Sequence, residues 1–97
     1  MKYQNGDTIG KLGTEVGTTL RDEKSTDGAR ITLEKDIKYG APFAITFGIY
    51  GVMVTTIFRP VESEADYDFQ NIKALIDIYF SDDLEDDDWF EMFEAIY

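Results

Sequence analysis

The stretch that decides the fold is Pro42-Phe43-Ala44-Ile45-Thr46-Phe47-Gly48-Ile49-Tyr50-Gly51-Val52-Met53-Val54-Thr55-Thr56-Ile57-Phe58-Arg59. It is rich in β-branched and aromatic residues, and large side chains alternate with small ones, which is the period-two pattern of a β-strand. Tyr50-Gly51 lies at its middle, so the stretch predicts two strands folded into a hairpin. Because it carries no charge before Arg59, we expect other elements on both sides of these strands.

The turn of this hairpin decides which side chains share a face. A two-residue turn at Tyr50-Gly51 pairs Phe47 with Val54 and Thr46 with Thr55. One face is then a solid apolar core, and the other is a shallow, uncharged face that includes Gly48 and the two threonines. A turn of three to five residues would shift the pairing by one residue and exchange these faces. We expect the two-residue turn and keep the longer turn as the alternative.

Two segments precede this hairpin. Residues 18–38 alternate apolar and polar residues around Asp27-Gly28, which predicts an outer hairpin with one buried face and one wet face.

Residues 1–17 contain four glycines and few apolar anchors, which predicts an irregular arm. The run Gly6-Asp7-Thr8-Ile9-Gly10-Lys11-Leu12 is only superficially similar to a phosphate-binding loop. Its spacing is one residue short, and Leu12 replaces the hydroxyl residue that would bind magnesium.

From Glu62 onward the apolar residues recur with a helical period. The spacing predicts a helix from about residue 63 to residue 80 and a second over residues 84–97, whose acidic first turns suit the positive end of the helix dipole. We therefore expect one α+β domain over residues 1–97. It consists of a Gly-rich arm (1–17), a four-stranded, mainly antiparallel sheet of two consecutive hairpins (18–59), and an acidic helical part (62–97) whose two C-terminal helices pack on one face.

The charge is distributed unevenly along the chain. Residues 1–40 hold seven basic and seven acidic side chains, whereas residues 41–97 hold two basic and thirteen acidic ones, so the net charge of −11 lies entirely in the second half. Such a surface repels phosphate backbones, which argues against nucleic-acid binding and favours a basic protein partner. Because no apolar run is long enough for a signal peptide or a membrane span, we expect a cytoplasmic protein without a membrane partner.

Catalytic chemistry is difficult to assemble from this composition. The chain contains neither histidine nor cysteine, so the usual base near neutral pH, the thiolate nucleophile and the cysteine-type zinc site are all missing. The acidic run at residues 82–88 lacks the alternating ligands and the central glycine of a calcium loop. We therefore expect a protein that is not an enzyme and that holds no metal and no cofactor.

The leading functional hypothesis is a small interaction protein. It would present an acidic helical surface, from about Glu62 to Glu94, to a basic partner, as an inhibitor, an immunity-type protein or a nucleic-acid mimic. Carboxylates next to aromatic anchors are typical of binding surfaces. The candidate residues are Asp82, Asp83, Glu85, Asp86, Asp87, Asp88, Trp89, Phe90, Phe93 and Tyr97. Packing inside the domain is the first explanation for the four aromatic residues, because so small a domain needs all its aromatic area.

Two alternatives belong to other classes. Thr46, Gly48 and Thr55 would offer hydroxyl groups and free space on an uncharged sheet face, which suits a small ligand. The third hypothesis is a homodimer that forms through residues 89–97 or through an exposed edge strand.

Overall fold

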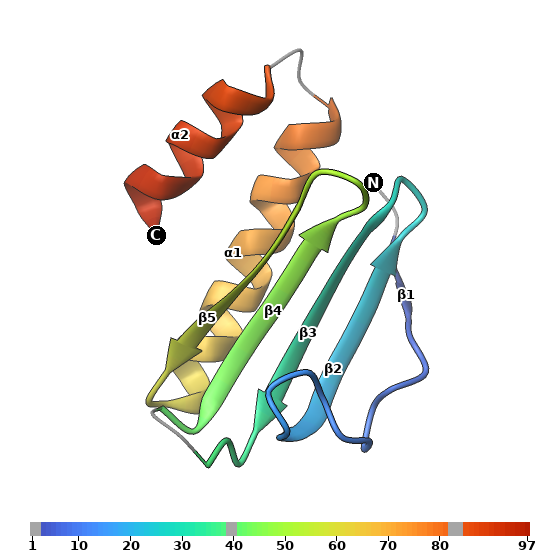
Figure 1. Cartoon of the computed structure of the whole chain (residues 1–97), viewed down its shortest axis with the longest axis vertical. Coiled ribbons are helices and arrows are strands. Elements are labelled where there is room, and N and C mark those ends of the chain that lie inside the picture. Colours follow the sequence, from blue (N-terminus) through green and yellow to red (C-terminus); the bar gives the residue numbers. More distant parts are fainter. Residues whose placement is uncertain (1–2, 39–40, 82–84) are drawn as a thin grey trace.

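The computed structural model describes residues 3–38, 41–81 and 85–97, which form one antiparallel sheet and two helices (Figure 1). The fold is α+β, as expected, and both C-terminal helices lie on one face of the sheet. The sheet has five strands rather than four, in the order β1-β2-β3-β4-β5. The elements are β1 (Tyr3–Asn5), β2 (Thr18–Ser25), β3 (Ala29–Lys35), β4 (Phe43–Ile49), β5 (Met53–Arg59), α1 (Glu62–Ser81) and α2 (Asp86–Ile96).

The additional strand comes from the arm, whose first residues pair with the end of β2. Tyr3 lies opposite Ser25, and Asn5 lies opposite Glu23. Tyr3 anchors this strand from the helix side, because the Lys73 ammonium of α1 lies 4.7 Å from the centre of its ring. Three residues with a single apolar side chain are too few to give a period-two pattern, which explains why the sequence did not predict this strand.

The core lies between the sheet and the helices. Side chains at alternate positions of β3 and β4, such as Ile31 and Phe47, point toward α1 and are almost completely buried. The predicted stripe of α1, including Phe69 and Ile76, covers them. The apolar period of residues 62–81 therefore predicted both the helix and its buried face correctly.

The second helix is fixed to the first by an indole ring. Trp89 is completely buried, and its Nε1–H donates a hydrogen bond to the Leu75 carbonyl oxygen at 2.8 Å. The ring of Phe93 stacks on Trp89 at 5.5 Å between centroids and also contacts Phe47 of the sheet at 5.1 Å. These contacts place α2 beside α1 on the same face (Figure 1).

The turn between β4 and β5 corrects the predicted pairing. Tyr50, Gly51 and Val52 form a three-residue loop with a positive φ of 76° at Gly51, so Ile49 pairs with Met53. The pairing shifts by one residue, as the alternative turn requires. In addition, β5 is the outer strand on its side of the sheet, so of the two strands of this hairpin only β4 has a neighbouring strand on each side.

The shifted pairing moves the side chains of β5 to faces opposite to those expected. Thr55 lies beside Phe47 and therefore faces the helices, whereas Thr56 lies beside Thr46 on the other face. Phe58 also moves to that other face and keeps 43% of its surface exposed, although the two-residue turn would have placed it in the core.

Candidate functional site on the open face of the sheet

The open face is the side of the sheet that the two helices leave uncovered. Because neighbouring strands are in register, its side chains form rows that run across β2, β3, β4 and β5. The row nearest the hairpin loops ends in an apolar residue, the middle row is largely threonine, and the third row contains a buried carboxylate. In strand order the rows are Lys24–Arg30–Gly48–Val54, Asp22–Thr32–Thr46–Thr56 and Thr19–Glu34–Ala44–Phe58.

Glu34 holds the arm against this face. Its side chain is completely buried and accepts hydrogen bonds from the backbone N–H groups of Glu15 and Gly17, both at 3.1 Å. The Thr14 hydroxyl lies 3.3 Å from the same carboxylate. Gly13 passes so close that a Cβ atom there would overlap the carboxylate of Glu34. The arm therefore crosses the open face in front of β2 (Figure 1), because the buried Glu34 carboxylate binds its backbone.

Asp22 is the second buried carboxylate on the open face. The Arg30 guanidinium binds both of its oxygens, with Nε 2.9 Å from Oδ1 and Nη2 2.7 Å from Oδ2, and the Thr8 N–H donates to Oδ2 at 3.1 Å. Burial by itself raises the pKa of Asp22, but the hydrogen bonds from Arg30 and Thr8 outweigh it and hold the pKa below its usual value. Asp22 is therefore an anion that fixes the direction of Arg30.

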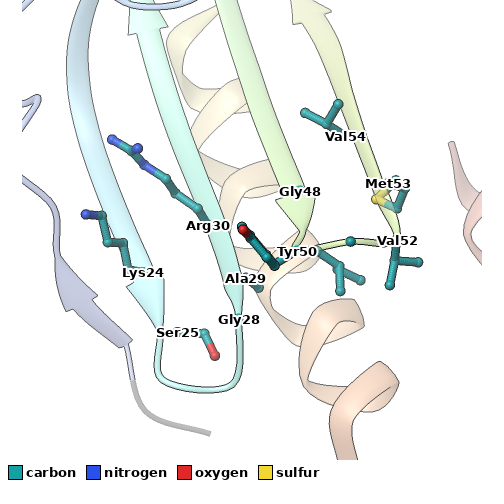
Figure 2. Close-up of a pocket in the computed structure, with 12 residues that line it drawn as sticks. Lys24, Ser25, Gly28, Ala29, Arg30, Gly48, Tyr50, Val52, Met53 and Val54 are labelled. Carbon is teal, nitrogen blue, oxygen red and sulfur yellow. The ribbon is translucent and has the colours of Figure 1, made fainter.

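A groove crosses the open face between the two hairpin loops. This hairpin groove is wide open to solvent, has a volume of about 650 Å³ and is mainly apolar, with walls that include Tyr50, Val52 and Val54. Figure 2 shows Lys24 and Arg30 on one side, Val54 on the other, and Gly48 between them. Because Gly48 has no side chain, the row is interrupted there and the floor of the groove is backbone. A volume of this size lies within the range of sites for small molecules.

A second groove continues from the first toward the arm. This arm groove encloses about 320 Å³ between the arm and the sheet, and it shares Arg30, Gly48 and Val54 with the hairpin groove. Its walls carry the hydroxyl groups of Thr14 and Thr46, which lie 3.3 Å apart. The Thr46 hydroxyl also lies 3.0 Å from that of Thr56. The open face thus joins an apolar groove to a groove lined with hydroxyl groups.

Both grooves can bind a molecule, but they offer little for acid–base chemistry. The two buried carboxylates of this face, Asp22 and Glu34, already accept hydrogen bonds from Arg30 and from the arm. The residues that line the two grooves include no carboxylate. Within the described part of the chain, no group of three or more acidic side chains is arranged to hold a metal ion.

The structure separates the residues of the predicted ligand face. Thr46 and Gly48 line the arm groove together, whereas Thr55 faces the helices and does not belong to the site. Sequence analysis missed Arg30, Lys24 and Val54. The alternation in residues 29–35 places Arg30 on the wet face, but the row that joins these three residues to Gly48 depends on the pairing of four strands.

Part of the predicted acidic surface lies among the described residues, and its carboxylates are exposed to solvent. Glu85, Asp86, Asp87 and Asp88 are exposed at the start of α2, and Asp86 accepts a hydrogen bond from the Tyr79 hydroxyl at 2.9 Å. None of the ion pairs between described residues includes a carboxylate of α2. Asp82 and Asp83 lie outside the described residues.

The aromatic residues proposed for this surface are mainly internal. Trp89 and Phe93 are buried in the core, so neither is available to a partner at the surface. Phe90 and Tyr97 are half-buried, and the Tyr97 hydroxyl accepts a hydrogen bond from the Asn71 amide at 2.8 Å. Packing within the domain therefore explains Trp89 and Phe93, and the exposed part of α2 is chiefly its carboxylates.

Comparisons of this chain with protein-family models, with curated proteins and with solved structures gave no match. Neither of the described helices is long and apolar enough to cross a membrane.

Proposed function

We propose that this protein is a binding protein rather than an enzyme, and that it holds a small ligand in the hairpin groove. The observation that carries the proposal is the interrupted row on the open face. Gly48 brings no side chain to the row between Arg30 and Val54, so the floor there is backbone, with the side chain of Val54 3.5 Å from where a Cβ atom would stand. Small-molecule sites combine a concave apolar surface with a few fixed polar groups, and Arg30 is fixed here by Asp22.

The absence of histidine and cysteine from the sequence supports a binding role over a catalytic one. The engagement of Asp22 and Glu34 in hydrogen bonds supports it further, because a general base needs a free lone pair directed at the substrate. The hydroxyl groups of the arm groove add donors and acceptors for the polar end of a larger ligand.

Replacing Val54 with aspartate tests this proposal. Val54 is 75% exposed, so the variant is expected to fold normally, but it places a charge in the wall of the apolar groove. We expect the affinity for Nile red, a neutral apolar dye, to fall about ten-fold, measured by fluorescence titration. Val61→Asp is the matched control, because Val61 is also exposed (49%) and lies outside both grooves. Equal affinities of Val54→Asp and Val61→Asp for the dye would contradict the proposal.

A second candidate function is the binding of a basic protein through α2. It is supported by the carboxylates of Asp87, Asp88, Glu91 and Glu94, which are exposed on a helix that Trp89 fixes to the domain. A rigid helix with unpaired charges costs little ordering entropy when a partner binds. The unpaired charges also accelerate association with a partner of opposite charge.

Neutralising two of these charges tests the second candidate. A partner captured from the source organism at low salt and released at high salt would be purified, and its association rate would be measured with the wild-type protein and with Asp87→Asn/Asp88→Asn. We expect the rate to fall about three- to ten-fold and its salt dependence to become weaker. Asp27→Asn/Asp36→Asn removes the same charge from exposed positions outside α2. Association that is equally fast for all three proteins would count against an acidic binding surface.

A further inference from the structure

The charged side chains that line the two grooves are all basic. Lys24 and Arg30 are the charged residues of the hairpin groove, and Arg30 is the charged residue of the arm groove. This is unexpected for a chain with a net charge of −11. The lining of the hairpin groove is therefore basic on an acidic protein.

Lys24 and Arg30 lie directly opposite each other on β2 and β3. Two like charges at such a cross-strand pair destabilise a sheet unless an anion compensates them. Asp22 compensates Arg30 through two hydrogen bonds, at 2.9 and 2.7 Å. The Lys24 side chain forms no hydrogen bond or ion pair with the described residues and is exposed beside the groove (Figure 2). Its ammonium group can therefore bind a further anion.

The row that crosses the hairpin groove is basic at one end and apolar at the other. It begins with the two basic side chains, passes over the gap at Gly48 and ends at Val54, with Tyr50 and Val52 at the rim. Four neighbouring strands extend over roughly 14 Å, because adjacent strands lie about 4.8 Å apart. A molecule that follows the row would place a charged end near Lys24 and an apolar body over Gly48.

We propose that the ligand of the hairpin groove is a small amphipathic anion, with its anionic head at Lys24 and Arg30 and its apolar body over Gly48 against Val54. This inference rests on the proposed ligand-binding function and adds the chemical class of the ligand. The head is a carboxylate or a phosphate, because both accept hydrogen bonds from ammonium and guanidinium groups.

The test compares four probes that share a ten-carbon chain: decanoate, decyl phosphate, decanol and decylamine. Each is titrated into the ¹⁵N-labelled protein, and the shifts of the Gly48, Tyr50 and Val54 amide signals report binding in the groove. We expect decanoate to bind about five-fold more tightly than decanol and decylamine to bind most weakly, since a partly exposed ion pair contributes up to about 1 kcal/mol. The ratio of decyl phosphate to decanoate affinity identifies the preferred head group.

Lys24→Gln supplies the decisive variant. We expect it to weaken decanoate about five-fold, to the affinity of decanol, and to leave decanol unchanged. Lys38→Gln is the control, because it removes the same charge from an exposed residue that lines neither groove. Equal binding of decanoate and decanol by the wild-type protein would overturn the anionic class while the groove remained a ligand site. Unchanged amide signals with all four probes would overturn the proposed function as well.

Discussion

Replacing Trp89 with alanine is expected to lower the free energy of unfolding by about 3–5 kcal/mol. The indole is completely buried, donates a hydrogen bond to the Leu75 carbonyl oxygen and stacks on Phe93. Without it, α2 loses its main contact with α1. An isolated helix of 11 residues is marginal in water, so part of the helical signal should disappear with the contact. Urea unfolding followed by circular dichroism measures both effects. Tryptophan fluorescence cannot follow the unfolding of this variant, because Trp89 is the single tryptophan of the sequence.

Two variants show whether the loss is specific to the buried ring. Ile96→Ala removes an apolar side chain of α2 that is 53% exposed, and it should cost no more than about 0.5 kcal/mol. Trp89→Phe keeps an aromatic ring but removes the indole N–H, and it should fall between the wild type and Trp89→Ala. If Trp89→Ala and Ile96→Ala unfolded at the same urea concentration, α2 would not be docked through its indole.

The helical half of the fold could be predicted because its signal is local. Ala65, Phe69 and Ile76 recur at the helical period, and the same spacing that identifies α1 also identifies the face that is buried. The alternation of Ile31 and Leu33 with polar residues likewise predicted the inner face of β3. In each case, neighbours along one element determine the structure.

The errors occurred where the structure depends on partners distant in sequence. The choice between a two-residue and a three-residue turn at Tyr50 changes the pairing of every residue in β5, yet both turns suit the same residues. The three-residue turn places Ile57 beside Ile45, where it packs partly buried against the core, and the sequence of the turn does not reveal this contact. For the same reason, Thr55 was placed on the ligand face when Thr56 occupies that position.

The candidate site shows the same limit. Net charge drew attention to the helices, where the carboxylates are adjacent in sequence, whereas Lys24, Arg30 and Val54 belong to three different strands. They become one site only when the sheet is paired. Asp22 and Glu34 belong to the predicted outer hairpin, and they are buried because the Gly-rich arm folds over them.

Replacing Glu34 with alanine is expected to detach the arm and to lower the free energy of unfolding by about 3 kcal/mol. The carboxylate accepts backbone hydrogen bonds from Glu15 and Gly17, and a hydrogen bond to a charged group contributes about 1.5–3 kcal/mol. Hydrogen exchange should accelerate at these two amides far more than in β4, because release of the arm leaves the core intact. Glu64→Ala removes an exposed carboxylate and should change the stability by less than about 0.5 kcal/mol. If the Glu15 and Gly17 amides of the Glu34→Ala variant exchanged their hydrogens as slowly as in the wild type, Glu34 would not hold the arm on the sheet.

Gly13 supplies an independent test of the same contact. A Cβ atom at Gly13 would overlap the Glu34 carboxylate, so Gly13→Ala forces the arm away from the sheet and should destabilise the wild-type protein. In the Glu34→Ala background the overlapping group is absent, and the same substitution should cost much less. Because the two residues touch, their effects are expected to be non-additive by about 1–3 kcal/mol in a double-mutant cycle. Additive effects would mean that Gly13 is required for the shape of the loop rather than for its approach to the buried carboxylate.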